Sequence, residues 1–317
     1  MRIAVFKHNG GHRIGIAPKD SGDLLIDSVA VSELLNLGSS DPPGDMVSLI
    51  SSSSEPNGRY TQLKQAINDN AQTLASAQRS VKDLKLEAPL ARPGKIICLA
   101  GNYREHIVES GYVAPQESAT ITQQLFLKPA SAIIGNDDEI VIGSQNHTVG
   151  WETELAVVIG KRGRNIKAKD AYDHVFGYTI LNDVSERGLN SRVENRTKRE
   201  MDGFFDWLAG KWFDCFAPSG PWIVTADEID DPHNLEITLT VNNRIRQQGN
   251  TRDMIFRIPE QIAYSSSIMT LEPGDIISTG TPVGAGVGGD KSLHDGDELV
   301  CEIEGIGKLR NKVRADN

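Results

Sequence analysis

Three carboxylates with a particular spacing are the residues best placed to do chemistry in this chain. Glu152 and Glu154 open an apolar run, residues 155–159, and Asp183 follows an extended segment, residues 178–182. Side chains two residues apart on a strand point to the same face, so a neighbouring strand can bring Asp183 to both glutamates. Like charges that converge beside an apolar core repel one another unless a cation compensates them. An all-oxygen ligand set favours Mg²⁺ or Mn²⁺, and Ca²⁺ is also compatible.

A second interpretation of the same carboxylates needs no metal. Acidic residues at strand ends are commonly solvated or paired with basic side chains, and Lys161, Arg162 and Arg164 lie close enough in sequence to pair. Glu-x-Glu is also a common tripeptide, so the spacing alone leaves both interpretations open.

A histidine and a glutamate three residues apart form another candidate pair. His106 and Glu109 belong to a segment of helical character, residues 102–109, in which side chains three apart share a face. A carboxylate beside an imidazole orients the ring and raises its basicity, which gives a general base for water near neutral pH. An ordinary surface pair fits the same pattern.

Lys211 is a candidate for binding negative charge, because it stands among aromatic residues in the segment 210–218. An ammonium group there needs a counter-charge, which a substrate carboxylate or a developing oxyanion would supply. A lysine that lies over Trp212 and Phe213 fits equally well. Further along, the Gly-rich segment 278–286 offers hydroxyls and free backbone N–H groups to an anion.

The Gly-rich segment also satisfies a dinucleotide-binding pattern formally, through Gly284, Gly286 and Gly289. No helix is expected after it, so the pattern lacks the structural context that dinucleotide binding requires. We therefore interpret it as a substrate loop.

The composition is that of an acidic globular protein. The chain has 317 residues, 38% hydrophobic and 24% charged, with a formal net charge of −10. This balance argues against nucleic acid as a partner, because binding to phosphate needs a basic face. Cys98, Cys215 and Cys301 form no C-x-x-C pair, and without a signal peptide they predict reduced thiols and a cytoplasmic protein. No apolar run approaches the roughly 20 residues that cross a bilayer.

The elements that must position these residues are mostly short strands. The first 90 residues predict a small α+β domain, with strands at 1–6 and 14–16, helices at 32–37 and 60–75, and a polar loop at 39–58. Residues 91–317 predict a second, β-rich domain, in which helices are expected only at 102–111, 168–171 and 259–269. Its strands are expected at 96–100, 133–134, 139–142, 154–159, 178–181, 222–224, 235–241, 275–278 and 298–303. A mixed β-sandwich or rolled sheet is the natural architecture.

Taken together, these segments resemble the fumarylacetoacetate hydrolase family, in the same order from about Pro93 to Gly307. The segments that carry the resemblance are 101–106, 126–129, 151–160, 177–185, 210–221, 250–254 and 278–284. The resemblance implies a β-rich roll with a small N-terminal domain, and a homodimer. The metal ligands that it implies, for Mg²⁺ or Mn²⁺, are Glu152, Glu154 and Asp183. The positions that match the family's substrate pocket are Lys128, Arg187, Gln247, Gly280 and Thr281.

The resemblance also implies roles in a reaction. His106 and Glu109 would form a water-activating dyad, and Lys211 would face the substrate. The implied activity is metal-dependent hydrolysis of a C–C bond in a β-diketo acid of the acylpyruvate, fumarylacetoacetate or fumarylpyruvate type. The alternatives are decarboxylation of oxaloacetate, or isomerase, hydratase or lyase action on an unsaturated 2-keto acid. A different class of protein, a non-catalytic binding protein with structural Ca²⁺, also stays open.

One stretch departs from the family pattern. Gly188, Leu189 and Asn190 stand where the family usually has Asp, any residue and Gln. Asn190 is one methylene shorter than glutamine, so a direct substrate contact there would be lost or mediated by water. We expect the following segment, residues 191–207, to cover the pocket.

Overall fold

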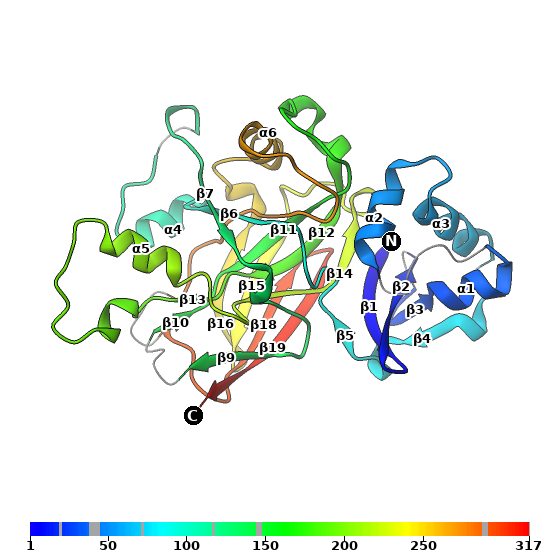
Figure 1. Cartoon of the computed structure of the whole chain (residues 1–317), viewed down its shortest axis with the longest axis horizontal. Coiled ribbons are helices and arrows are strands. Elements are labelled where there is room, and N and C mark those ends of the chain that lie inside the picture. Colours follow the sequence, from blue (N-terminus) through cyan, green and yellow to red (C-terminus); the bar gives the residue numbers. More distant parts are fainter. Residues whose placement is uncertain are drawn as a thin grey trace.

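The architecture was determined from a computed structural model, which describes residues 1–18, 21–37, 45–70, 73–115, 118–143, 148–286 and 291–316 (Figure 1). The N-terminal strands are β1 (Arg2–His8), β2 (Gly11–Ala17), β3 (Leu24–Asp27), β4 (Gln78–Ser80) and β5 (Leu86–Glu87). The helices beside them are α1 (Ser28–Leu35), α2 (Met46–Ser51) and α3 (Arg59–Asn70). Figure 1 shows these helices grouped at one end of the molecule.

The rest of the chain is dominated by strands. These are β6 (Ile96–Ala100), β7 (Gln124–Lys128), β8 (Ile133–Ile134), β9 (Glu139–Gly143), β10 (Val149–Gly150), β11 (Thr153–Ile159), β12 (Val175–Asn182), β13 (Ser185–Glu186), β14 (Ala217–Thr225), β15 (Glu236–Val241), β16 (Arg244–Asn250), β17 (Ile276–Ser278), β18 (Glu298–Ile303) and β19 (Gly307–Asp316). Its α-helices are α4 (Arg104–Glu109), α5 (Asp202–Ala209) and α6 (Ile258–Ile268). The predicted β-rich α+β class is confirmed.

Two sheets organise the molecule. The larger follows the order β4-β3-β2-β1-β14-β12-β11-β17-β6-β7, and the smaller the order β16-β15-β18-β19-β9. β1 pairs with β14, so the N-terminal strands continue the same sheet as the rest of the chain. The division near residue 90 stays a prediction.

The central strand β11 is covered on both faces. Leu155 and Val157 pack in one core with side chains of the smaller sheet, such as Leu239. Ala156 and Val158 face a second core, to which the N-terminal helices also contribute. Burial on both faces explains why residues 155–159 are continuously apolar instead of alternating.

Some elements differ from the sequence prediction. The polar loop expected at 39–58 contains α2, whose first turn is capped by the Asp45 side chain, which accepts a hydrogen bond from the Ser48 N–H. The serine run continues from α2 into a 3₁₀ turn, Ser52–Ser54. Residues 39–44 of that loop lie outside the described part. The third helix ends at Asn70 rather than at residue 75.

Beyond residue 90, α5 was not expected, and the prediction of helices only at 102–111, 168–171 and 259–269 is wrong there. Residues 168–171 belong to a 3₁₀ helix, Ala168–His174. No helix in the described ranges is long and apolar enough to cross a membrane.

Candidate active site

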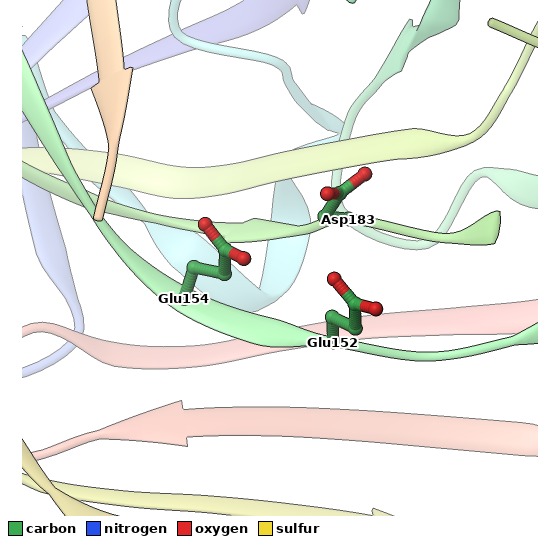
Figure 2. A group of neighbouring side chains, drawn as sticks. All are labelled: Glu152, Glu154 and Asp183. Carbon is green, nitrogen blue, oxygen red and sulfur yellow. The ribbon is translucent and has the colours of Figure 1, made fainter. Parts of the chain in front are cut away.

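Glu152, Glu154 and Asp183 converge at the ends of two neighbouring strands (Figure 2). β11 and β12 pair antiparallel, with Glu154 opposite Leu181, so Asp183 lies two residues beyond the partner of Glu154. Side chains two apart share a face, which places all three carboxylates on one side of the sheet. Each offers an oxygen within 4.8 Å of the others, and all three residues are buried.

The backbone holds this arrangement through a residue that we had not singled out. Asn182 Oδ1 accepts the backbone N–H of Glu152 at 2.9 Å, and the Asp183 N–H donates to the Glu152 carbonyl at 2.8 Å. Asn182 therefore fixes the position of Glu152 just before β11 begins. Its place next to Asp183 was the only sequence signal for this role.

Three buried or half-buried cations surround two of the carboxylates. Lys211 Nζ donates to Glu152 Oε2 at 2.8 Å and to Asp183 Oδ2 at 2.7 Å. Lys128 Nζ donates to Asp183 Oδ1 at 2.6 Å, and Arg187 pairs with Glu152. Pairing with basic residues does occur, therefore, but the partners are distant in sequence.

The basic residues close in sequence have other contacts. Arg162 pairs with Glu272, and Arg164 donates to the carbonyl of Ser266. Neither contributes to the carboxylate cluster.

Glu154 is bound differently from its two neighbours. Its Oε2 accepts the Ser278 hydroxyl at 2.5 Å and the Gly280 N–H at 2.9 Å, and within the described residues it forms no ion pair. Burial, with the charges of Asp183 and Glu152, raises the pKa of Glu154 well above its usual value. Burial also opposes ionisation of Glu152, but Lys211 and Arg187 outweigh it and hold that pKa at about 2. A divalent cation would supply the positive charge that Glu154 lacks, so the all-oxygen donor set fits such an ion.

His106 and Glu109 lie near each other without a hydrogen bond. His106 Nδ1 is 3.8 Å from Glu109 Oε2. Glu109 instead accepts the Gly284 N–H at 2.9 Å and Lys291 Nζ at 2.6 Å. Burial lowers the pKa of His106 despite the opposing charge of Glu152, so the imidazole is neutral at pH 7 and can accept a proton.

Lys211 is fully buried, but its surroundings are not those expected. Its Nζ lies 5.2 Å from the ring centroid of Phe126 and 5.9 Å from that of Trp207. The alternative in which it lies over Trp212 and Phe213 is therefore wrong. Its counter-charges come from the protein, because Asp183 and Glu152 raise the pKa of Lys211 against the opposing effect of burial.

The Gly280-Thr281 turn and Gln247 brace β11. The Gln247 amide accepts the Thr153 N–H at 2.9 Å and donates to Thr281 Oγ1 at 2.8 Å and to the Pro282 carbonyl at 3.0 Å. Gly280 has a φ of +91°, and a Cβ there would lie 2.7 Å from Asn102 Cβ, so only glycine fits the turn. Substrate contacts by these residues, and by Lys128 and Arg187, stay predictions.

The divergent stretch after Arg187 leads into α5. Glu186 Oε1 accepts the Gly188 N–H at 2.5 Å, and Asn190 is exposed. Trp207 in α5 contacts both Phe126 and Lys211, so the segment 191–207 reaches the carboxylate cluster at its far end.

The fold and this site define a class of protein. Residues 95–314 match the model of the fumarylacetoacetate (FAA) hydrolase C-terminal domain. The chain belongs to the fumarylacetoacetate hydrolase family, and it is an enzyme of that family.

Particular relatives narrow the comparison. The human mitochondrial oxaloacetate tautomerase FAHD2A is 41% identical over 262 residues, which cover 79% of each chain. The crystal structure of maleylpyruvate hydrolase from Sphingobium sp. SYK-6 is 34% identical and superposes with a TM-score of 0.76 over 100% of both chains. A second structure of that enzyme contains manganese(II) and pyruvate, with 33% identity, a TM-score of 0.75 and 100% coverage of both chains. The buried acidic cluster here is likewise suited to a divalent metal.

Proposed function

We propose that this chain is a divalent-metal-dependent enzyme that takes a proton from, or returns it to, the enolisable carbon of a small 2-oxo acid. The observation that carries the proposal is the buried cluster in which Glu152 and Asp183 have cationic partners and Glu154 has none within the described residues. Glu152, Glu154 and Asp183 would hold the ion. When bound, Mg²⁺ or Mn²⁺ would polarise the carboxylate and keto oxygens of the substrate as a Lewis acid.

His106 is the proposed base. Its neutral imidazole, buried beside Glu152, Lys211 and Arg187, can take a proton from the carbon next to the keto group and return one to the product. Lys211 would limit the charge of the cluster as the enolate forms, because its ammonium group already lies between Glu152 and Asp183.

Keto–enol tautomerisation of oxaloacetate or a close analogue is the first candidate reaction. The likeness to FAHD2A supports it. The reaction moves one proton from carbon to oxygen, and a neutral imidazole without a carboxylate hydrogen bond is sufficient for that step. His106 meets this condition in the described conformation.

Hydrolysis of a C–C bond in a β-diketo acid is the second candidate. The full-length likeness to maleylpyruvate hydrolase supports it. In this reaction His106 would take a proton from water, the water oxygen would bond to the distal carbonyl carbon, and the C–C bond would break to leave an enolate. A homodimer and a cytoplasmic location remain part of the proposal.

Replacement of His106 tests the proposed base. His106→Asn should lower kcat by about 10²–10⁴, because general-base catalysis typically contributes that much. In the unchanged protein, kcat/KM should fall as pH drops through a value below the ordinary imidazole pKa of about 6.5. Steady-state assays with Mg²⁺ or Mn²⁺ on enol-oxaloacetate, acylpyruvates and fumarylpyruvate measure both effects.

The products of those assays separate the candidates. Cleavage releases pyruvate, whereas tautomerisation exchanges hydrogen at carbon 3 in D₂O and releases no pyruvate. Release of CO₂ from oxaloacetate that persists in His106→Asn would identify a decarboxylase. Tight Ca²⁺ binding without turnover of any of these acids would instead support the non-catalytic alternative and contradict the proposal.

A further inference from the structure

Glu109 holds the Gly-rich loop rather than the imidazole that it was expected to orient. Its Oε1 accepts Lys291 Nζ at 2.6 Å, and its Oε2 accepts the Gly284 N–H at 2.9 Å. The 3.8 Å from Oε2 to His106 Nδ1 is too long for a hydrogen bond. Both carboxylate oxygens of Glu109 are therefore bound to the segment that follows β17.

This attachment matters because α4, which carries His106, is short. A helix of six residues has little stability of its own, and Val108 on it is 61% exposed. Ile107 packs partly against the core, and the Asn102 amide ties the preceding turn to the carbonyls of Phe256 and Thr279. Glu109, the last residue of α4, is the ionic contact that fixes its C-terminal end.

The loop to which Glu109 is bound offers a firm anchor. The Gly284 carbonyl accepts Trp151 Nε1 at 3.0 Å. A Cβ on Gly284 would lie 2.1 Å from the Arg246 carbonyl oxygen, so this backbone packs directly against β16. Gly284 therefore cannot follow Glu109 if the glutamate moves, whereas the side chain of Lys291 can.

We propose that Lys291 is a positioning residue for proton transfer at His106: its ion pair with Glu109 secures α4 on the Gly-rich loop and keeps the carboxylate from the imidazole. The inference rests on the proposed role of His106. It also assigns Glu109 a different role, as an anchor whose negative charge is largely neutralised by Lys291.

The charges around His106 determine the sign of the effect. Glu152 and Glu109 favour the imidazolium form, and Lys211 and Arg187 oppose it. Without Lys291, the charge of Glu109 is no longer neutralised and its carboxylate is free to turn to Nδ1. Both changes stabilise the protonated ring, so more of the base is already protonated at neutral pH.

Substitution of Lys291 with methionine tests this inference in the Mg²⁺-bound protein without substrate. Titration of the His106 ring by NMR, assigned with His106→Asn, should give a pKa raised by roughly half a unit in Lys291→Met, since the pair is partly exposed. The acid limb of kcat/KM should move to higher pH by the same amount. Lys291→Arg should restore both values, and Lys308→Met, which removes a surface partner of Glu302, should change neither.

Two further variants show whether Lys291 acts through Glu109. Glu109→Gln should shift the His106 pKa downwards, the opposite direction, and adding Lys291→Met to it should have no further effect on that pKa. An unchanged His106 titration in Lys291→Met would overturn the inference, even if turnover fell. Full activity in His106→Asn would instead contradict the proposed function, and the substrate-free titration would still report on Lys291.

Discussion

Glu154→Gln should abolish turnover and leave the metal-free protein at least as stable as the unchanged one. Loss of a metal ligand removes several kcal/mol of transition-state stabilisation, so we expect kcat to fall by about 10³ or more. The Ser278 hydroxyl and the Gly280 N–H both donate to one oxygen of Glu154, and the glutamine carbonyl can accept both. The neutral side chain also removes repulsion from Glu152 and Asp183.

The dependence on pH gives this prediction a sign. The pKa of Glu154 is raised in the folded protein, so ionisation of Glu154 penalises folding increasingly as pH rises above its unfolded value. Glutamine carries no such penalty. In chelator, the melting temperature of Glu154→Gln should therefore match that of the unchanged protein at acidic pH and exceed it increasingly towards neutral pH.

Asp183→Asn is the matched contrast. Asp183 pairs with the buried Lys128 and Lys211, so neutralising it leaves two ammonium groups poorly compensated and should cost about 3–5 kcal/mol. Calorimetric unfolding and Mg²⁺ titration of both variants separate loss of the ion from loss of the fold. Normal Mg²⁺ binding by Glu154→Gln would contradict the metal site.

The carboxylate cluster was predictable because it depends on local rules. The two-residue period of a strand puts Glu152 and Glu154 on one face, and a continuous apolar run marks β11 as a buried strand. The antiparallel neighbour carrying Asp183 needs only the pairing of adjacent segments. The same short-range reasoning placed His106 and Glu109 on one face of a helix.

The cations of the site could not be predicted in this way. Lys128 and Lys211 reach Asp183 from 55 and 28 residues away, and Lys291 reaches Glu109 from 182 residues away. No periodicity encodes such contacts, since they depend on how whole strands pack. The helix α5 was missed for a related reason: the apolar residues Phe204 and Phe205 are exposed, so the pattern that marks a buried helix face is weak there.

Lys211→Met should destabilise the metal-free protein strongly, and Mg²⁺ should reverse much of that loss. Lys211 is the one residue of the described chain that donates to both Glu152 and Asp183, and the expectation that its loss would affect turnover more than folding needs revision. Without it, two buried carboxylates lose their shared partner, at a cost of about 3–5 kcal/mol. A divalent ion bound to the same carboxylates compensates their charge and stabilises the folded state by mass action.

Turnover separates the two roles of Lys211. Even when Mg²⁺ restores the fold, kcat should stay about 10²–10³ below normal, because a donor that stabilises developing charge is missing. Melting temperatures with and without Mg²⁺ measure the rescue, and Lys308→Met controls for loss of a lysine on the surface. Because the ion and the ammonium group would compensate the same oxygens, Mg²⁺ should raise the melting temperature more in Lys211→Met than in the unchanged protein. An equal rise in both would show that they act on different groups.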